Sequence, residues 1–140
     1  MKKNENKKIL LIEDNLGDAR LIIELFNEFL PGCSIVHKIR AEDSVEYLLN
    51  TDSLPNLIIL DLKLNGMNGF ECLKELKYNR DTLIIPIVVL SSSAMEEDIY
   101  KAYDFYANCY IRKSISLNEF QRIINSIIDF WFNTALLPVK

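Results

Sequence analysis

The feature that most constrains this chain is a regular alternation of short, unbroken apolar runs with longer amphipathic stretches. Continuous apolar runs of four or five residues are typical of strands that are buried on both faces of a sheet. The second run, at residues 34–39, instead has the alternating pattern of an edge strand. The runs lie at residues 8–12, 34–39, 57–60, 86–90 and 108–111. Stretches with apolar residues at helical spacing follow them, at 16–30, 41–50, 69–79, 96–106 and 117–131.

Strands that are separated by helices pair in parallel through right-handed crossovers, which place helices on both faces of the sheet. The sequence therefore predicts an α/β fold: a doubly wound, five-stranded parallel sheet with five flanking helices. With 140 residues, of which 49% are hydrophobic, the chain is expected to form one domain with a substantial core. We expect a flexible N-terminal tail at 1–7, the domain at 8–132 and a C-terminal tail at 133–140.

Composition excludes several classes of protein. The formal net charge of −4 argues against a nucleic-acid-binding surface. No run of about 18 apolar residues is present, so we expect no membrane span. The three cysteines are odd in number and far apart, which favours reduced thiols in a cytoplasmic protein over a disulfide framework or a metal site.

Both ends of the last helix carry local signals. Ser116 and Glu119 have the spacing of a capping box, in which each side chain accepts a hydrogen bond from a free backbone donor of the first turn. At the other end Phe130, Trp131 and Phe132 are consecutive, so one helical face cannot bury all three. We expect either that this segment folds back onto its own domain or, as we favour, that it forms a homodimer contact.

Polar residues follow the apolar runs at the points where the strands are expected to end. Glu13 and Asp14 follow the first run, Asp61 follows the third, a row of serines follows the fourth, and Lys113 follows the fifth. Ligands of open parallel sheets bind beyond the carboxyl ends of the strands, where these groups would meet. The serines are Ser91, Ser92 and Ser93.

Three carboxylates in one crevice repel one another unless their pKa values rise or a cation lies among them. Oxygen ligands without histidine or cysteine favour Mg²⁺ over zinc. A lysine and a hydroxyl nearby would complete a site for a phosphoryl group, so the chemistry that fits best is phosphoryl transfer. Asp61 is then the natural acceptor, forming an acyl phosphate.

Four segments together resemble the receiver domain of two-component response regulators: "ILLIEDN", "LIILDLKLNGMNG", "IVVLSSS" and "YIRK". The resemblance covers about residues 8–132 and implies the flavodoxin-like strand order 2-1-3-4-5. Within the family, "EDNLGDARL" and "FW…LP" are similar to single-domain regulators associated with phytochrome-type sensor kinases.

The resemblance implies that a histidine kinase phosphorylates Asp61. It implies that Glu13 and Asp14 hold Mg²⁺ together with Asp61, and that the backbone carbonyl of Lys63 is a further metal ligand. Glutamate at position 13 is compatible with this role because it can act through a water. Gly69 fits the tight turn after the phosphorylated loop.

The resemblance also assigns a switch. Ser91 is the hydroxyl that moves toward the phosphoryl group, Tyr110 is the aromatic that swings inward behind it, and Lys113 pairs with the phosphate. Lys63 and Ser93 are candidates for tuning the lifetime of the phosphate. Their alternative interpretations are a solvent-facing lysine and a turn or helix-cap serine.

Three positions depart from the family pattern. Ser114 follows Lys113 where proline, joined by a cis bond, is usual, and a non-proline cis bond costs about 3 kcal/mol. We expect Lys113 to reach the site whether this bond is cis or trans. Asn65 replaces another usual proline, which should loosen the loop. Tyr106 stands where glycine commonly closes the fourth helix, which suggests a different helix end.

Other functions are open on the same fold. A phosphate shuttle and a non-phosphorylated receiver-like binding module remain alternatives. An aspartyl-phosphate phosphohydrolase would need an acid where Lys63 stands, and a flavodoxin-like cofactor binder would need a glycine-rich loop where the acidic "EDNLGD" lies. Only 27 residues follow Lys113, so we expect output through protein contacts rather than through a further domain.

Overall fold

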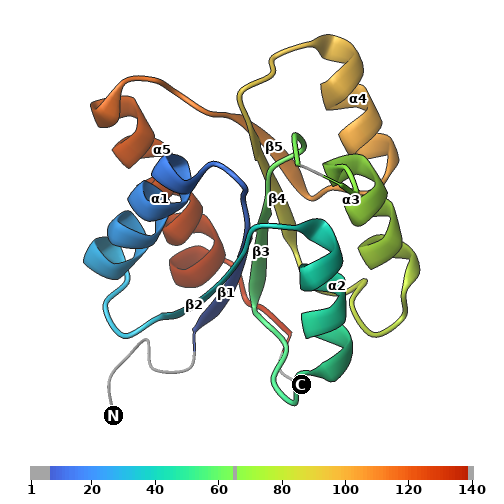
Figure 1. The fold of residues 1–140 in the computed structure, drawn as a ribbon. Helices are drawn as coiled ribbons and strands as arrows, with labels where there is room; N and C mark the ends of the chain where they lie inside the picture. Colours follow the sequence, from blue (N-terminus) through green and yellow to red (C-terminus); the bar gives the residue numbers. More distant parts are fainter. Residues whose placement is uncertain (1–6, 65, 139–140) are drawn as a thin grey trace.

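The structure is a computed structural model that describes residues 7–64 and 66–138. Strands and helices alternate along the chain from the first strand to the last helix (Figure 1). The strands are β1 (Lys8–Ile12), β2 (Ser34–Lys38), β3 (Leu57–Leu60), β4 (Ile87–Ser91) and β5 (Cys109–Arg112). The helices are α1 (Leu16–Phe29), α2 (Ala41–Asn50), α3 (Gly69–Tyr78), α4 (Glu96–Asp104) and α5 (Leu117–Ile128), which continues into the π-helical segment η1 (Asp129–Thr134).

All strand pairs in the sheet are parallel, and the order is β2-β1-β3-β4-β5. Strand β1 lies between β2 and β3 and places Leu10 opposite Val36 of β2 and opposite Ile58 of β3. The predicted fold class and strand order are therefore confirmed. The chain reverses its direction of travel across the sheet at β1, so the carboxyl ends of β1 and β3 flank the switch point where ligands of this fold bind.

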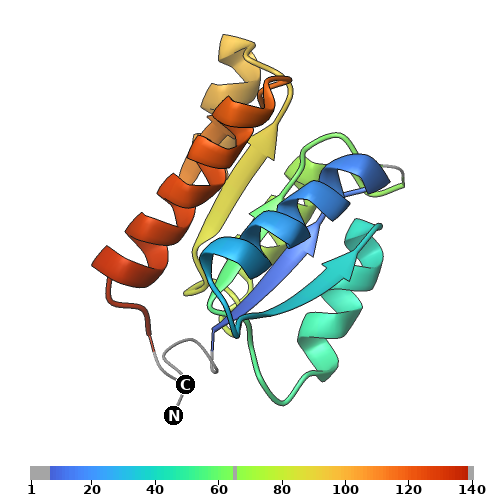
Figure 2. The same ribbon diagram turned by 90° about the vertical axis from the view of Figure 1, so that its left-hand side faces the viewer.

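The helices form two layers around the sheet. Helices α1 and α5 cover one face, and α2, α3 and α4 cover the other (Figures 1 and 2). Each layer encloses its own apolar cluster: Phe26, Ile124 and Ile128 belong to the first, and Leu48 and Leu73 to the second. Burial on both faces explains why β1, β3 and β4 are apolar at nearly every position.

Side-chain caps fix where three helices begin. Asn15 accepts a hydrogen bond from the Asp18 backbone at the start of α1, and Asn68 accepts one from Glu71 at the start of α3. Ser116 does the same for α5, accepting from the Glu119 backbone at 3.5 Å. The other half of the predicted capping box is wrong, because the Glu119 carboxylate accepts from Arg122 and the Ser116 backbone donates to Ser114 Oγ instead.

The end of α4 differs from expectation. Tyr106 adopts the left-handed conformation, with φ at 69°, that glycine normally supplies. Its backbone donates to Tyr103, and the backbone of Ala107 donates to Ala102, so the helix closes as a left-handed cap in spite of the side chain. The suggestion that this helix ends differently is wrong, and the Tyr106 ring packs edge-on against Tyr78, at a centroid distance of 6.1 Å.

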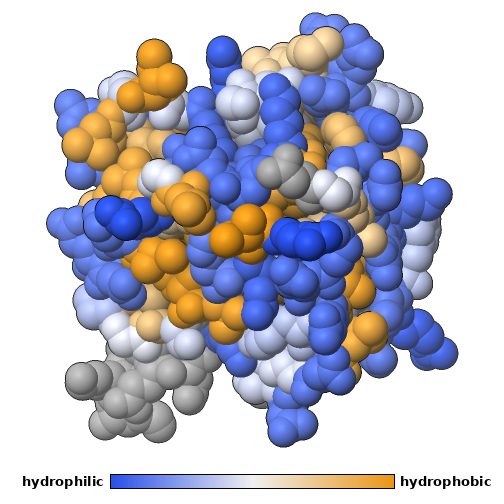
Figure 3. All heavy atoms as spheres, viewed as in Figure 1, coloured by the Kyte–Doolittle hydropathy of each residue, from blue (hydrophilic) through white to orange (hydrophobic). Residues whose placement is uncertain are grey.

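Of the three consecutive aromatic residues after α5, at 130–132, one is buried in the core and the others are partly exposed. Phe132 is buried in the cluster beneath α1 and α5, whereas Phe130 is 52% exposed and contacts the half-buried Trp131 edge-on. Leu137 packs back on the same cluster, and Leu136 is fully solvent-facing. Figure 3 shows apolar side chains gathered on the surface over the α1 and α5 side of the molecule.

Two further expectations concern a membrane-spanning helix and the segments at Asn65 and at the N-terminus. No helix within residues 7–64 and 66–138 is both long and apolar enough to cross a bilayer. The expectations for Asn65 and for residues 1–6 lie outside the described residues.

Candidate functional site

Three carboxylates converge at the carboxyl ends of β1 and β3. Glu13 and Asp14 come directly after β1, and Asp61 directly after β3, so the parallel pairing of these strands brings them together. One oxygen from each lies within 4.8 Å of the others. Glu13 is 1% exposed and Asp61 6% exposed, whereas Asp14 is half-buried. An all-oxygen cluster of this kind suits a hard divalent cation.

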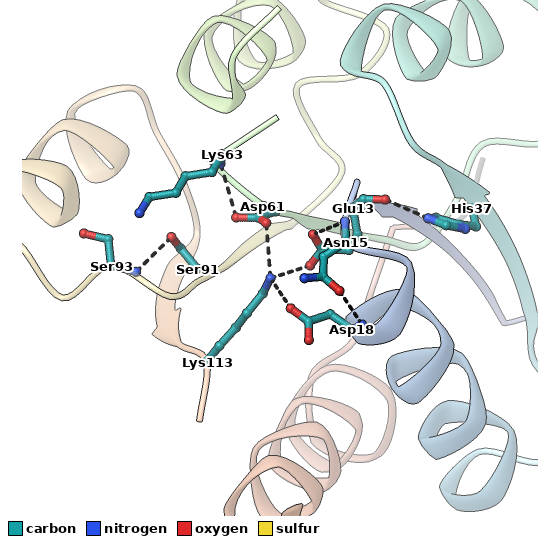
Figure 4. A network of polar contacts seen from close by, with 9 residues as sticks. All are labelled: Glu13, Asn15, Asp18, His37, Asp61, Lys63, Ser91, Ser93 and Lys113. Carbon is teal, nitrogen blue, oxygen red and sulfur yellow. Dashed lines mark hydrogen bonds and ion pairs between the residues drawn. The ribbon is translucent and has the colours of Figure 1, made fainter. Parts of the chain in front are cut away.

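The Lys113 side chain extends into this cluster from the end of β5 (Figure 4). Its Nζ lies 2.6 Å from Glu13 Oε1 and 3.1 Å from Asp61 Oδ2. Its third partner is Asp18 Oδ2 of α1, at 2.9 Å. The peptide bond to Ser114 is trans, and Lys113 reaches the acids from it. One ammonium therefore faces three carboxylates.

The pKa values of Glu13 and Lys113 are both raised in this cluster, for different physical reasons. Burial raises the pKa of Glu13 to about 8, and the hydrogen bond and charge of Asp61 add to this, although Lys113 opposes it. Burial lowers the pKa of Lys113, but hydrogen bonds to Glu13 and Asp18 and the charge of Asp61 outweigh it and raise that pKa above its ordinary value. A bound cation would therefore stabilise the ionised form of Glu13.

The loop after Asp61 folds tightly against the start of α3. Asp61 Oδ1 accepts a hydrogen bond from the Lys63 backbone at 3.2 Å, and the Gly69 backbone donates to the Leu62 carbonyl at 3.0 Å. A Cβ atom at Gly69 would lie 2.3 Å from Leu62 Cα and 2.5 Å from the Asp61 carbonyl oxygen. Glycine is therefore required for α3 to approach the backbone of the acidic residue this closely.

The hydroxyl residues after β4 have separate places. Ser91 is fully buried at the end of β4, and its Oγ accepts from the Ser93 backbone at 3.3 Å. Ser93 Oγ accepts from the Met95 backbone and donates to Asp98 at 2.7 Å, so this side chain caps the approach to α4. Tyr110 is half-buried, and its hydroxyl donates to the Ser93 carbonyl at 2.9 Å, which joins β5 to the loop after β4.

Lys63 points its ammonium away from the acids and toward the loop after β4 (Figure 4). Among the described residues, its side chain forms no ion pair with Glu13, Asp14 or Asp61. The charge that balances the cluster comes from Lys113 instead.

Three contacts of the site were not predicted from the sequence. The Asp18 carboxylate contacts Lys113, and the His37 ring Nε2 lies 2.8 Å from the Glu13 carbonyl oxygen. Glu42 of α2 accepts a hydrogen bond from the Met67 backbone at 2.9 Å and so holds the loop after Asp61 from the side. Asp14 lies before the Asn15 cap and outside α1, so helical spacing gave no signal for Asp18.

A cavity lies elsewhere in the described part of the chain. It measures about 920 Å³ and opens at the amino-terminal edge of the sheet, where Leu48, Pro55, Asn56 and Pro86 help to line it. None of the clustered carboxylates borders it. The charged cluster, and not the cavity, combines convergent polar groups with shifted pKa values, so we place the functional site there.

Comparison with known proteins identifies the family of this chain. Residues 9–125 match the response regulator receiver domain. The chain is 36% identical to the response regulator Rcp1 of Synechocystis, covering 96% of this chain and 95% of that protein, and 33% identical to a probable methanogenesis regulatory protein, FilR2, of Methanothrix harundinacea, covering 93% and 86%.

Solved structures agree as well. The phosphorylated cyanobacterial phytochrome response regulator RcpA superposes with a TM-score of 0.92 at 40% identity, covering 96% of this chain and 99% of that one. The Mn²⁺-bound form of Rcp1 gives 0.88 at 34% identity, covering 95% and 99%. The chain therefore belongs to the response regulator receiver domain family.

Proposed function

We propose that this protein is a phosphorylation switch of a two-component system. In this function Asp61 accepts a phosphoryl group from the phosphohistidine of a sensor kinase, and the change is passed on through protein contacts. The observation that carries the proposal is the convergence of Glu13, Asp14 and Asp61 oxygens within 4.8 Å, with the Lys113 ammonium 3.1 Å from Asp61.

The residues present fit a magnesium ion. The donor set is all oxygen, and among the described residues the buried Glu13 forms its ion pair with an ammonium that it shares with Asp18 and Asp61. Glu13, Asp14 and Asp61 would hold the ion, and the backbone carbonyl of Lys63 is the further ligand that we propose. When bound, Mg²⁺ neutralises charge on the phosphoryl oxygens.

The transfer itself needs a positioned carboxylate more than an acid or a base. One Asp61 oxygen attacks phosphorus, a P–O bond forms, and the P–N bond to the kinase histidine breaks. The imidazole leaves with the electron pair of that bond. Lys113 donates to the phosphoryl oxygens as charge accumulates there, which is the role expected of a buried cation beside the acceptor.

Two contacts support a switch role for Ser91 and Tyr110 in this proposal. Ser91 ends the strand beside β3, and its Oγ is already bonded to the Ser93 backbone. The Tyr110 hydroxyl bonds to the Ser93 carbonyl. We propose that Ser91 bonds to the phosphoryl group and draws this loop with it, and that Tyr110 follows. A lysine at position 63 tunes the phosphate lifetime in this proposal.

We propose a phytochrome-type histidine kinase as the partner and the cytoplasm as the location. The similarity to phytochrome response regulators supports the kind of kinase, and the free state of Cys33, Cys72 and Cys109 suits a reducing compartment. Exposed apolar side chains adjoin the site on the α1 and α5 side: Leu16, Ile115 and Leu117. They offer a docking surface beside the acceptor.

We also propose a homodimer through the end of α5 and the segment after it. Phe130 and Leu136 are exposed there, 52% and 98%. Because Phe132 is part of the core, point substitutions test this better than truncation. Phe130→Glu with Leu136→Glu should give a monomer by light scattering. A parent that is monomeric both with and without phosphate contradicts the dimer.

The acceptor is tested by intact-mass measurement after incubation with Mg²⁺ and acetyl phosphate. We expect one phosphate adduct on the parent, none on Asp61→Asn and none on the parent in excess EDTA. Asp52→Asn, an exposed loop aspartate, is the matched control and should keep the adduct. An unmodified parent would favour a receiver-like binding module, and an adduct on Asp61→Asn would refute Asp61 as the acceptor.

A further inference from the structure

Lys113 has three ammonium hydrogens and three carboxylate partners. They are Glu13 at 2.6 Å, Asp18 at 2.9 Å and Asp61 at 3.1 Å. Only Asp18 stands outside the group of acids that can share a cation, which comprises Glu13, Asp14 and Asp61. We propose that Asp18 is a positioning residue, which holds the Lys113 ammonium beside the acceptor when the other carboxylates engage a cation or a phosphoryl group. The inference rests on the proposed phosphoryl transfer to Asp61.

The position of Asp18 is fixed independently of Lys113. It lies in the first turn of α1, where its backbone donates to the capping side chain of Asn15 at 3.0 Å. Its carboxylate reaches Lys113 from the α1 side, whereas Asp61 reaches it from β3 (Figure 4). The ammonium is thus held from two different elements, α1 and the end of β3.

Charge sharing distinguishes the three partners. A cation bound to Glu13 and Asp61 withdraws negative charge from the oxygens that now attract Lys113. Asp18 keeps its full charge in that state, so it becomes the strongest partner of the lysine on the protein side. The other two ammonium hydrogens of Lys113 can then donate to phosphoryl oxygens while the contact with Asp18 keeps the side chain oriented.

Burial makes this ion pair stronger than an ordinary surface pair. The side chain of Lys113 is 10% exposed and that of Asp18 34% exposed, so the pair is screened by solvent on one side only. Exposed pairs contribute little because two mobile side chains must be ordered in water. Here the lysine is already enclosed, and Asp18 selects among its few remaining orientations.

The test is a double-mutant cycle on the rate of adduct formation with Mg²⁺ and acetyl phosphate, measured by intact mass. The variants are Asp18→Asn, Lys113→Gln and the two together. Asp18→Asn removes the charge and keeps the size. We expect it to slow phosphorylation about three- to tenfold, because Lys113 would regain part of the rotamer freedom that its contact with Asp18 removes. In the Lys113→Gln background the same change should leave the rate unchanged or raise it, because only its repulsion of the incoming phosphate then remains.

Two controls separate orientation from charge and from folding. Asp18→Glu restores the carboxylate and should recover most of the rate. Glu28→Gln removes one negative charge from the exposed side of the same helix and should leave the rate as in the parent. Thermal unfolding of each variant confirms that it is folded.

The outcomes are distinct. If the parent is phosphorylated and Asp18→Asn does not lower the rate, the inference is overturned and the proposed function is left intact. An equal fold-change with and without Lys113 also overturns it, because Asp18 would then act through general charge. A parent that takes up no phosphate overturns the proposed function, and this inference with it.

Discussion

Divalent-cation binding should depend steeply on pH, because the cation must displace a proton. Burial raises the pKa of Glu13 to about 8, and Asp61 adds to the shift. A group with this pKa is about 1% ionised at pH 6 and half ionised at pH 8, so the apparent Mg²⁺ affinity should rise about 50-fold over this range. This corresponds to about 2.3 kcal/mol at 1.36 kcal/mol for each tenfold change.

In the metal-free protein, the contribution of Glu13 to folding stability changes with pH in the opposite direction to the Mg²⁺ affinity. The folded pKa of Glu13 exceeds its unfolded value of 4.5, so the folded chain binds more protons between pH 4.5 and 8. The contribution of Glu13 to stability is therefore fully present below pH 4.5 and is lost as pH rises toward 8. A bound cation should restore stability in the upper part of this range, since it replaces the proton.

The assay is a Mg²⁺ titration at pH 6, 7 and 8, followed through the backbone amide NMR signals of Leu62 and Lys63. Glu13→Gln cannot lose a proton, so its affinity should be lower and nearly independent of pH. An affinity in the parent that changes less than about threefold across this range would refute the reasoning, because a proton-linked site must respond more strongly.

Three further predictions concern the scaffold of the site. Gly69→Ala should lower the free energy of unfolding by about 3 kcal/mol in urea, since its Cβ would lie 2.3 Å from Leu62 Cα and both backbones would have to move. Burial lowers the pKa of Lys77 to about 8. Between pH 7.5 and 9.5 the folded chain loses this proton while the unfolded chain keeps it, so the free energy of unfolding of the parent should rise by about 2 kcal/mol. Lys77→Met should show no such rise. Glu42→Ala removes the acceptor 2.9 Å from the Met67 backbone, so hydrogen exchange at the Met67 amide should accelerate while exchange in β1 stays unchanged.

Much of the fold follows from local pattern, and so does the acidic part of the site. Apolar runs that are buried on both faces read as strands, and parallel pairing brings the residues after each strand to one edge. Glu13, Asp14 and Asp61 could therefore be placed together without coordinates. Lys113 was placed in the same way, from its position after β5.

Contacts that depend on exact side-chain direction could not be predicted in this way. Glu119 has the spacing of a capping residue, but Arg122 lies three residues further along the helix and takes its carboxylate. Tyr106 shows that a backbone conformation can persist against the preference of its residue when tertiary packing requires it. Asp18 faces Lys113 across 95 residues of sequence, a pairing that no local pattern encodes.

The balance of charge connects the stability of this site to its function. Glu13 and Asp61 are almost fully buried, yet within residues 7–64 and 66–138 a single ammonium pairs with them, and that ammonium is shared with Asp18. A buried carboxylate that lacks a full countercharge destabilises the metal-free fold and by the same amount favours whatever supplies positive charge. The free energy that burial costs at Glu13 is thus available to bind a cation. In the function proposed above, a bound cation would take over part of the contact that Glu13 now makes with Lys113, and the lysine would be free to donate to a phosphoryl group on Asp61.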